Sequence, residues 1–171
     1  KVIYKHLDIA DLEKRLAEYP NQNIQKIIIS DSVFSTNGDV VDIGQLVSLK
    51  HKYNATLILD VSHSFGIENY SNYQGIDILT SSLSKACGAY GGVILSSNDV
   101  KDMLINHGRP LIYSSSLPIY NLYFIKRNIE KLINADDRRT KLNSLSKYFN
   151  QKLKALNVNY NSSNLPIKFI E

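Results

Sequence analysis

Four side chains that could act together in catalysis follow two apolar stretches of the sequence. Asp60 ends the run TLILD, and His63 comes three residues later. Ser82 and Lys85 follow a second apolar stretch and stand just before a glycine-rich segment. A carboxylate, an imidazole, a hydroxyl and an amine can together hold a phosphate and move protons beside it. Each also has a plain structural explanation, because aspartate and serine are common in loops that follow strands.

Several other kinds of site are excluded by the sequence. It contains no G-x-x-x-x-G-K phosphate loop, no G-x-G-x-x-G dinucleotide motif and no G-x-S-x-G nucleophile motif. The four histidines do not have the spacing of metal ligands. The single cysteine, Cys87, can form neither a disulfide within the chain nor a cysteine-built zinc site. We therefore expect no metal.

The composition is that of a globular protein. Of the 171 residues, 43% are hydrophobic and 21% are charged, which suits one domain of ordinary size or one domain and part of another. The sequence shows no membrane-length apolar run and no signal-peptide pattern. The net charge of +4 is mild, and the lone cysteine fits a reducing compartment. We expect a cytoplasmic protein that binds neither membrane nor nucleic acid.

Two features of the sequence suggest a piece of a longer protein. The first residue is Lys1 and the only methionine is Met103, whereas a complete translation product begins with methionine. The chain also starts and ends within apolar stretches, Val2–Tyr4 and Leu165–Ile170. We therefore expect that part of any site lies outside these residues.

Hydrophobic periodicity predicts alternating strands and helices. Short apolar runs rich in β-branched residues predict buried strands, and apolar residues spaced near 3.6 predict helices. The expected strands are 26–30, 56–60, 76–80, 92–95 and 111–113, with two more at 158–160 and 167–170. The expected helices are 8–16, 42–52, 98–106, 118–134 with Pro118 at its first position, and 138–156, and a turn is expected at 35–39.

This order of elements predicts an α/β fold. Strand and helix alternate through residues 1–115, and continuously apolar strands are typical of a mostly parallel sheet with helices on both faces. Ligands of such sheets bind beyond the carboxyl ends of the strands. The segments to examine are therefore Asp31–Ser35, Asp60–His63 and Ser81–Lys85.

Five segments, taken in order, resemble the motifs of the α-oxoamine synthases. These are pyridoxal-phosphate (PLP) enzymes of the aspartate-aminotransferase fold. Each motif alone is weak, but five in the right order and at about the right spacing are specific, and they cover Tyr4 to about Pro118. The matching segments are His6–Asp8 with Asp11–Glu13, Ser30–Asp39 (SDSVFSTNGD), Asp60–His63 (DVSH), Ser82–Ala86 (SLSKA) with the glycines after it, and Arg109–Pro118.

The resemblance implies PLP as the cofactor, and the chemistry of PLP explains two of the residues. The cofactor aldehyde needs an amine that binds it, later yields it to the substrate and serves as a base, and Lys85 fits this role. The pyridine nitrogen needs an anion that keeps it protonated, and Asp60 fits that role.

The resemblance also implies roles for the remaining polar residues. His63 would contact the phenolic oxygen of the cofactor, and Ser35 would lie in the same pocket. Ser82 would hold the phosphate, with serine where the family usually has threonine. Ser115 would reach the phosphate of the neighbouring subunit, which implies a homodimer with its active site at the subunit interface. His6 would be structural.

Members of this family condense an amino acid with an acyl-CoA and release carbon dioxide. The segments Leu83–Gly92 and Ile105–Arg109 look most like the member that joins L-alanine to a pimeloyl thioester in biotin biosynthesis. An alternative is the member that joins glycine to acetyl-CoA. A second alternative is a PLP-fold protein that has lost activity and serves as a binding module, and an unrelated nucleic-acid-binding domain is a distant third.

The sequence departs from the family pattern in three places. Val61 replaces the second acidic residue of the D-[DE]-[AS]-H motif. The usual Gly-Arg-Gly loop is missing between Gly66 and Ile76, where a shorter segment stands. The family's ring-stacking histidine and its carboxylate-binding arginine would lie outside these residues. We therefore expect this piece alone to be a poor catalyst.

The chain is expected to contain parts of two domains. The charged segment Asp136–Arg139 separates two helical patterns. We predict that residues 1–136 form the PLP-binding large domain, incomplete at its N-terminus, and that residues 137–171 begin a smaller α+β domain. One apolar face of the last helix must pack on a partner, and its residues are Leu142, Leu145, Phe149, Leu153 and Leu156.

Overall fold

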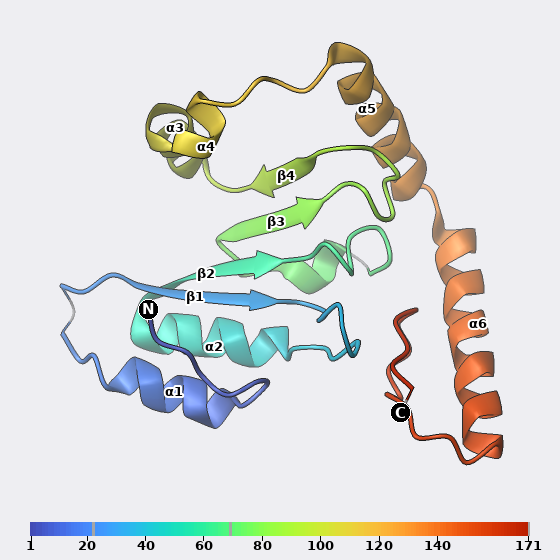
Figure 1. Ribbon diagram of the computed structural model, residues 1–171. Helices are drawn as coiled ribbons and strands as arrows, with labels where there is room; N and C mark the ends of the chain where they lie inside the picture. The colour runs from blue at the N-terminus through green and yellow to red at the C-terminus, as the bar shows by residue number, and fades with distance from the viewer. Residues whose placement is uncertain (22, 69, 171) are drawn as a thin grey trace.

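A four-stranded, mostly parallel sheet forms the centre of the molecule. The computed structural model describes residues 1–21, 23–68 and 70–170. Strands β1 (Lys26–Asp31), β2 (Ala55–Asp60) and β3 (Ile78–Ser82) run parallel, and β4 (Gly92–Leu95) is antiparallel to β3. The strands lie in sequence order across the sheet (Figure 1). The α/β class predicted from the sequence is confirmed.

Two helices pack along β1 and β2 (Figure 1). Helix α1 (Ile9–Ala17) begins after Asp8, whose side chain accepts a hydrogen bond from the Asp11 amide. Helix α2 (Ile43–Tyr53) begins after Asp42, whose side chain accepts one from the Gln45 amide. Both carboxylates satisfy amide groups that the first helical turn leaves without an acceptor, so they fix where each helix starts.

The core lies between these helices and one face of the sheet. Burial alternates along β2, where Leu57 and Leu59 are fully buried and the side chains between them are partly exposed. A sheet strand alternates its side chains in this way because successive residues point to opposite faces. The buried apolar residues of this core are Leu12, Leu16, Ile28, Val41, Leu46, Leu49, Ala55, Leu57, Leu59, Val61, Tyr73 and Leu79.

The expected strand at 111–113 is wrong. After α3 (Asn98–His107), the chain forms a short helical turn, α4 (Arg109–Ile112), with Pro110 in its first turn. Proline fixes the backbone angle that a helix start needs. Leu111 and Ile112 are also exposed, so this apolar run does not fill the interior of a sheet.

Helix α5 (Ile119–Ile133) covers the loop that carries Lys85 (Figure 1). Its apolar face packs on a small buried cluster after β3, and Asn128 donates a hydrogen bond to the Cys87 carbonyl at 2.7 Å. The helix begins at Ile119, one residue later than expected, and Pro118 is the residue directly before it. The cluster contains Leu83, Cys87 and Ala89, against which Phe65, Val93, Ile125, Ile129 and Leu132 pack.

The last region consists of α6 (Asp136–Ala155) and an irregular segment that folds back along it (Figure 1). Ser146 donates a hydrogen bond to the Leu165 carbonyl at 3.1 Å and so holds this segment to the helix. The strands expected at 158–160 and 167–170 are wrong, because the described part of this region shows only an isolated antiparallel bridge between Tyr160 and Ile170. The division into two domains stays a prediction.

Two connections matter for the site. The chain leaves β1 through a turn at residues 35–37, which Val33 and Val40 close with an isolated antiparallel bridge. The segment after β2 includes a short 3-10 helix, η1 (Tyr70–Tyr73), which leads back to β3. Among the helices of the described residues, none has the length and apolar character needed to span a bilayer.

Candidate active site

A row of polar side chains crosses the sheet at the carboxyl ends of its parallel strands. Asp31 on β1 is the register partner of Asp60 on β2, and Asp60 is the partner of Thr80 on β3. Register partners on parallel strands project toward the same face. The turns that follow β2 and β3 carry His63 and Lys85, so both start from this edge of the sheet.

Asp60 is held as an oriented anion. Its Oδ1 accepts a hydrogen bond from the Ser62 amide at 2.8 Å, and its Oδ2 accepts one from Thr80 Oγ1 at 2.8 Å. Burial alone would raise the pKa of Asp60, but the hydrogen bonds from Ser62 and Thr80 and the positive charge of Lys85 outweigh it and lower the pKa. Asp60 is therefore ionised at neutral pH.

His63 and Lys85 lie in the turns that follow β2 and β3, and the charge of Lys85 acts on both Asp60 and His63. His63 is partly buried and Lys85 is exposed. Burial and the positive charge of Lys85 lower the pKa of His63, while the charges of Asp31 and Asp60 oppose that change. Because the net effect is a lowered pKa, His63 is mainly the neutral imidazole at pH 7, which can both accept and donate a hydrogen bond.

Serine hydroxyls connect the two loops. Ser62 Oγ accepts a hydrogen bond from the Ser82 amide at 2.8 Å, and Ser82 and Ser84 share a hydrogen bond between their hydroxyls at 2.8 Å. The turn that carries His63 and the turn that carries Lys85 are therefore tied together at their starting points.

Ser82 and Ser115 line the same cavity. It has a volume of about 600 Å³ and lies between the glycine-rich loop and the segment that follows α4. Hydroxyl groups and flexible glycine backbone are suited to binding a phosphate, since both can direct donors at its oxygens. The other residues around this cavity are Ser84, Tyr90, Gly91, Gly92, Leu111, Ser114, Ser116 and Leu117.

Ser35 lies in an exposed turn that His6 holds in place. His6 Nε2 lies 2.8 Å from Asp39 Oδ2, and the His6 ring meets the Phe34 ring edge-on with 4.4 Å between centroids. No interaction in the described structure links Ser35 directly to the row of Asp60 and Thr80. His6 thus contacts residues on both sides of the turn, and its structural role stays a prediction.

Asp31 was not singled out as a site residue by the sequence analysis. It is partly buried and stands beside Asp60 in the row. Burial raises the pKa of Asp31 and the charge of Asp60 raises it further, whereas His63 and Lys85 act in the opposite direction. Both apolar strands end in an aspartate, and this repetition was the signal that could have identified it.

A buried chain of hydrogen-bonded hydroxyl groups connects the segments next to the site. Ser32 and Ser64 share a hydrogen bond at 2.7 Å, and Tyr73 donates one to Ser64 at 2.7 Å. Burial, which outweighs the hydrogen bond to Ser64, raises the pKa of Tyr73 to about 12. The residues after β1, the turn after β2 and η1 are thereby fastened to one another.

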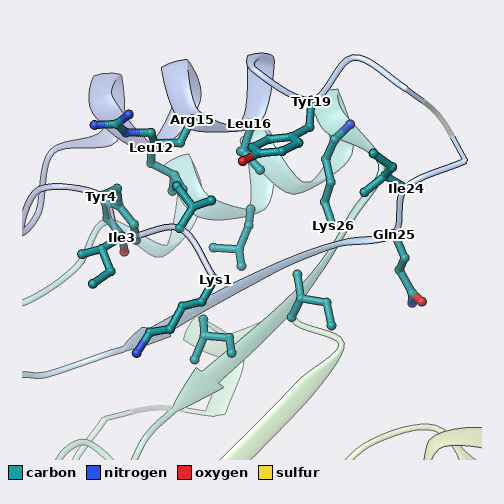
Figure 2. A pocket seen from close by; sticks show the side chains of 14 residues that line it. Lys1, Ile3, Tyr4, Leu12, Arg15, Leu16, Tyr19, Ile24, Gln25 and Lys26 are labelled. Carbon is teal, nitrogen blue, oxygen red and sulfur yellow. The ribbon is translucent and has the colours of Figure 1, made fainter.

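Another cavity, of about 810 Å³, lies away from this row. It opens between the first residues of the chain, α1 and β1, and its lining is mostly apolar (Figure 2). Asp60, His63 and Lys85 do not line it. Within the described residues, no group of histidine, cysteine, aspartate and glutamate side chains could hold a metal ion.

The chain matches the family model for aminotransferase class I and II over residues 1–168. The chain belongs to this family. Curated relatives agree with the more specific resemblance to the α-oxoamine synthases. The 8-amino-7-oxononanoate synthase of Thermoanaerobacter pseudethanolicus is 34% identical over 97% of this chain, and that of Alkaliphilus metalliredigens is 31% identical over 98%. The chain covers only 44% and 45% of these two relatives, so it spans less than half of their length.

Solved structures of this family share the fold. A serine palmitoyltransferase from S. paucimobilis with a bound PLP–myriocin aldimine superposes with a TM-score of 0.91 at 23% identity, covering 98% of this chain and 46% of that one. The 8-amino-7-oxononanoate synthase from Francisella tularensis superposes with a TM-score of 0.80 at 25% identity, covering 98% of this chain and 50% of that one. The first likeness shows the fold alone.

Proposed function

We propose that this chain supplies the cofactor-binding centre of a PLP-dependent 8-amino-7-oxononanoate synthase. In the whole protein, L-alanine and a pimeloyl thioester would be joined with loss of carbon dioxide, as a step of biotin biosynthesis. The observation that carries the proposal is the meeting of Asp60, His63 and Lys85 at one edge of the sheet. The names of the curated relatives support the choice of substrate class.

The state of Asp60 fits the ring of PLP. A protonated pyridine nitrogen needs an ionised carboxylate, and the bonds from Ser62 and Thr80 keep Asp60 ionised and oriented. PLP, when bound, draws electrons from the substrate through its protonated ring, which permits the loss of carbon dioxide and the formation of the new carbon–carbon bond. Asp60 would maintain that protonation throughout.

Lys85 and His63 fit the remaining tasks. Lys85 makes no ion pair with any residue that the structure describes, so its amine is accessible for covalent attachment of the cofactor and for carrying a proton. His63, as a neutral imidazole, can donate a hydrogen bond to the phenolic oxygen of the cofactor. Ser35 would lie at the border of the same pocket.

The phosphate would be bound by serine hydroxyls. Ser82 and Ser115 lie on one cavity beside the glycine-rich loop, which supports a phosphate site there. The proposal includes a homodimer, in which Ser115 would reach the phosphate of the neighbouring subunit. Tyr113 and Ile119, on either side of Ser115, are 84% and 85% exposed, so this segment is open to a partner subunit. A cytoplasmic location is also part of the proposal.

Covalent labelling of the full-length protein tests the central assignment. The protein would be incubated with PLP, reduced with borohydride and digested, and the labelled peptide mapped. We expect the label on Lys85 and its loss in Lys85→Ala, while Lys101→Ala, which changes an exposed lysine of α3, keeps it. A label on a different lysine would contradict the assignment, and failure to bind PLP would favour a binding module without activity.

Product analysis then tests the substrates. The full-length protein loaded with PLP and not reduced should release carbon dioxide with L-alanine and a pimeloyl thioester. Preference for glycine and acetyl-CoA would instead identify a 2-amino-3-ketobutyrate CoA ligase.

A further inference from the structure

The polar row contains one more charged group than the proposed function uses. Asp31 and Asp60 are register partners on neighbouring parallel strands and project toward the same face of the sheet. Burial agrees with this placement, because Ile28 and Leu57, three residues before each aspartate, face the core on the opposite side. Two carboxylates therefore stand side by side at the edge where His63 and Lys85 arrive.

The two carboxylates differ in their bonding. Asp60 accepts hydrogen bonds at both oxygens, from Ser62 and from Thr80. The carboxylate of Asp31 has no hydrogen bond or ion pair with the residues that the structure describes. The hydrogen bonds therefore fix the orientation of the Asp60 carboxylate, whereas the Asp31 carboxylate interacts with nearby groups only through its charge.

Three charged or titratable groups act on the carboxyl group of Asp31. They are Asp60 on β2, His63 in the turn after β2 and Lys85 in the turn after β3. The charge of Lys85 and partial burial disfavour a proton on His63, and the charges of Asp31 and Asp60 favour it. Without Asp31, a single carboxylate would face both the amine and the imidazole.

We propose that Asp31 is a positioning residue of the active site, whose carboxylate offsets the positive charge of Lys85 and so favours the uptake of a proton by His63. This proposal rests on the proposed function in one respect, because it is there that His63 is paired with the phenolic oxygen of PLP. Its geometric basis is the register that sets Asp31 beside Asp60, at the edge of the sheet from which the turns of His63 and Lys85 start.

Titration of the His63 imidazole by NMR in the full-length protein without PLP tests the proposal. The signal would be assigned by its loss in His63→Gln. In Asp31→Asn, which removes the charge and keeps the shape, we expect the pKa of His63 to fall by about half to one pH unit. Asp31→Glu should restore it. Asp102→Asn, which removes an exposed carboxylate on α3, should leave it unchanged.

The outcomes separate the two proposals. An unchanged pKa of His63 in a folded Asp31→Asn protein would overturn the role of Asp31. A pKa that falls as far in Asp31→Glu as in Asp31→Asn would also overturn it, because Asp31→Glu keeps the charge. If Asp31→Asn fails to fold, Asp31→Ser repeats the test with a smaller side chain. Failure of PLP to label Lys85 in the wild-type protein would instead refute the proposed function, while the His63 titration would still decide the role of Asp31.

Discussion

At the scale of single residues, the placement of the candidate residues at one edge of the sheet was predictable from the strand ends. Asp60, His63 and Lys85 stand just after apolar strands, and parallel strands bring such positions to a single edge of the sheet. Asp31 was missed because its importance comes from register, which sets it beside Asp60. Which residues of two strands become register partners depends on packing of the whole sheet and is not written in either strand alone.

Replacing Asp60 should damage catalysis far more than folding. Under the proposed function, Asp60→Ala would remove a charge-assisted hydrogen bond to the cofactor ring, worth roughly 1.5 to 3 kcal/mol of binding. Turnover of the full-length enzyme should fall by about 100-fold or more, because preorganised charge at the reacting group is lost. Steady-state kinetics at saturating PLP measure this effect, with Asp99→Asn on α3 as a control that keeps its turnover. Near-normal turnover in Asp60→Ala would show that another group protonates the ring.

At the scale of elements, the sequence predicted most helices and strands because periodicity and capping residues agree. Two helices were expected from Asp8 and Asp42, and these residues precede and cap α1 and α2. The failures have a common cause, since short apolar runs at 111–113, 158–160 and 167–170 were taken for buried strands. Leu111 and Ile112 are exposed, so a run of three apolar residues does not by itself establish burial. The C-terminal runs form no ladder beyond one bridge in the described structure.

The buried hydrogen bond from Tyr73 to Ser64 makes a contribution to stability that depends on pH. Tyr73 has a pKa of about 12 in the folded protein, against about 10 for an unfolded tyrosine. Its contribution to stability is therefore fully present below pH 10 and is lost as pH rises toward 12, because the unfolded chain gives up this proton first. Urea unfolding between pH 9 and about 12 should show the wild type losing stability relative to Tyr73→Phe over that interval.

The matched control for this experiment is Tyr19→Phe, at a tyrosine just after α1 that is 42% exposed. Its alkaline stability profile should follow that of the wild type. A wild-type profile parallel to that of Tyr73→Phe would mean that Tyr73 ionises normally in the folded state.

At the scale of the whole molecule, the junction between α5 and α6 joins the sheet region to the C-terminal region. The predicted domain boundary after residue 136 falls within the first turn of α6. Arg139 lies at this junction. Its guanidinium donates to the Leu132 carbonyl at 2.6 Å and to the Gly66 carbonyl at 3.5 Å, and it pairs with Asp136 at 2.7 Å. One side chain thus connects α5, α6 and the loop after β2.

Loss of Arg139 should therefore loosen the two regions from each other. Arg139→Ala removes the side-chain donor to the Leu132 and Gly66 carbonyls and the ion pair with Asp136, which should cost about 1 to 3 kcal/mol in the free energy of unfolding. Limited proteolysis of the full-length protein should show faster cleavage between residues 133 and 140, with both products still resistant elsewhere. Arg138→Ala removes an exposed arginine at the next position and should leave the rate unchanged. Equal cleavage rates in the two variants would show that the junction is held by other contacts, whereas global degradation of Arg139→Ala would argue against two separately folding regions.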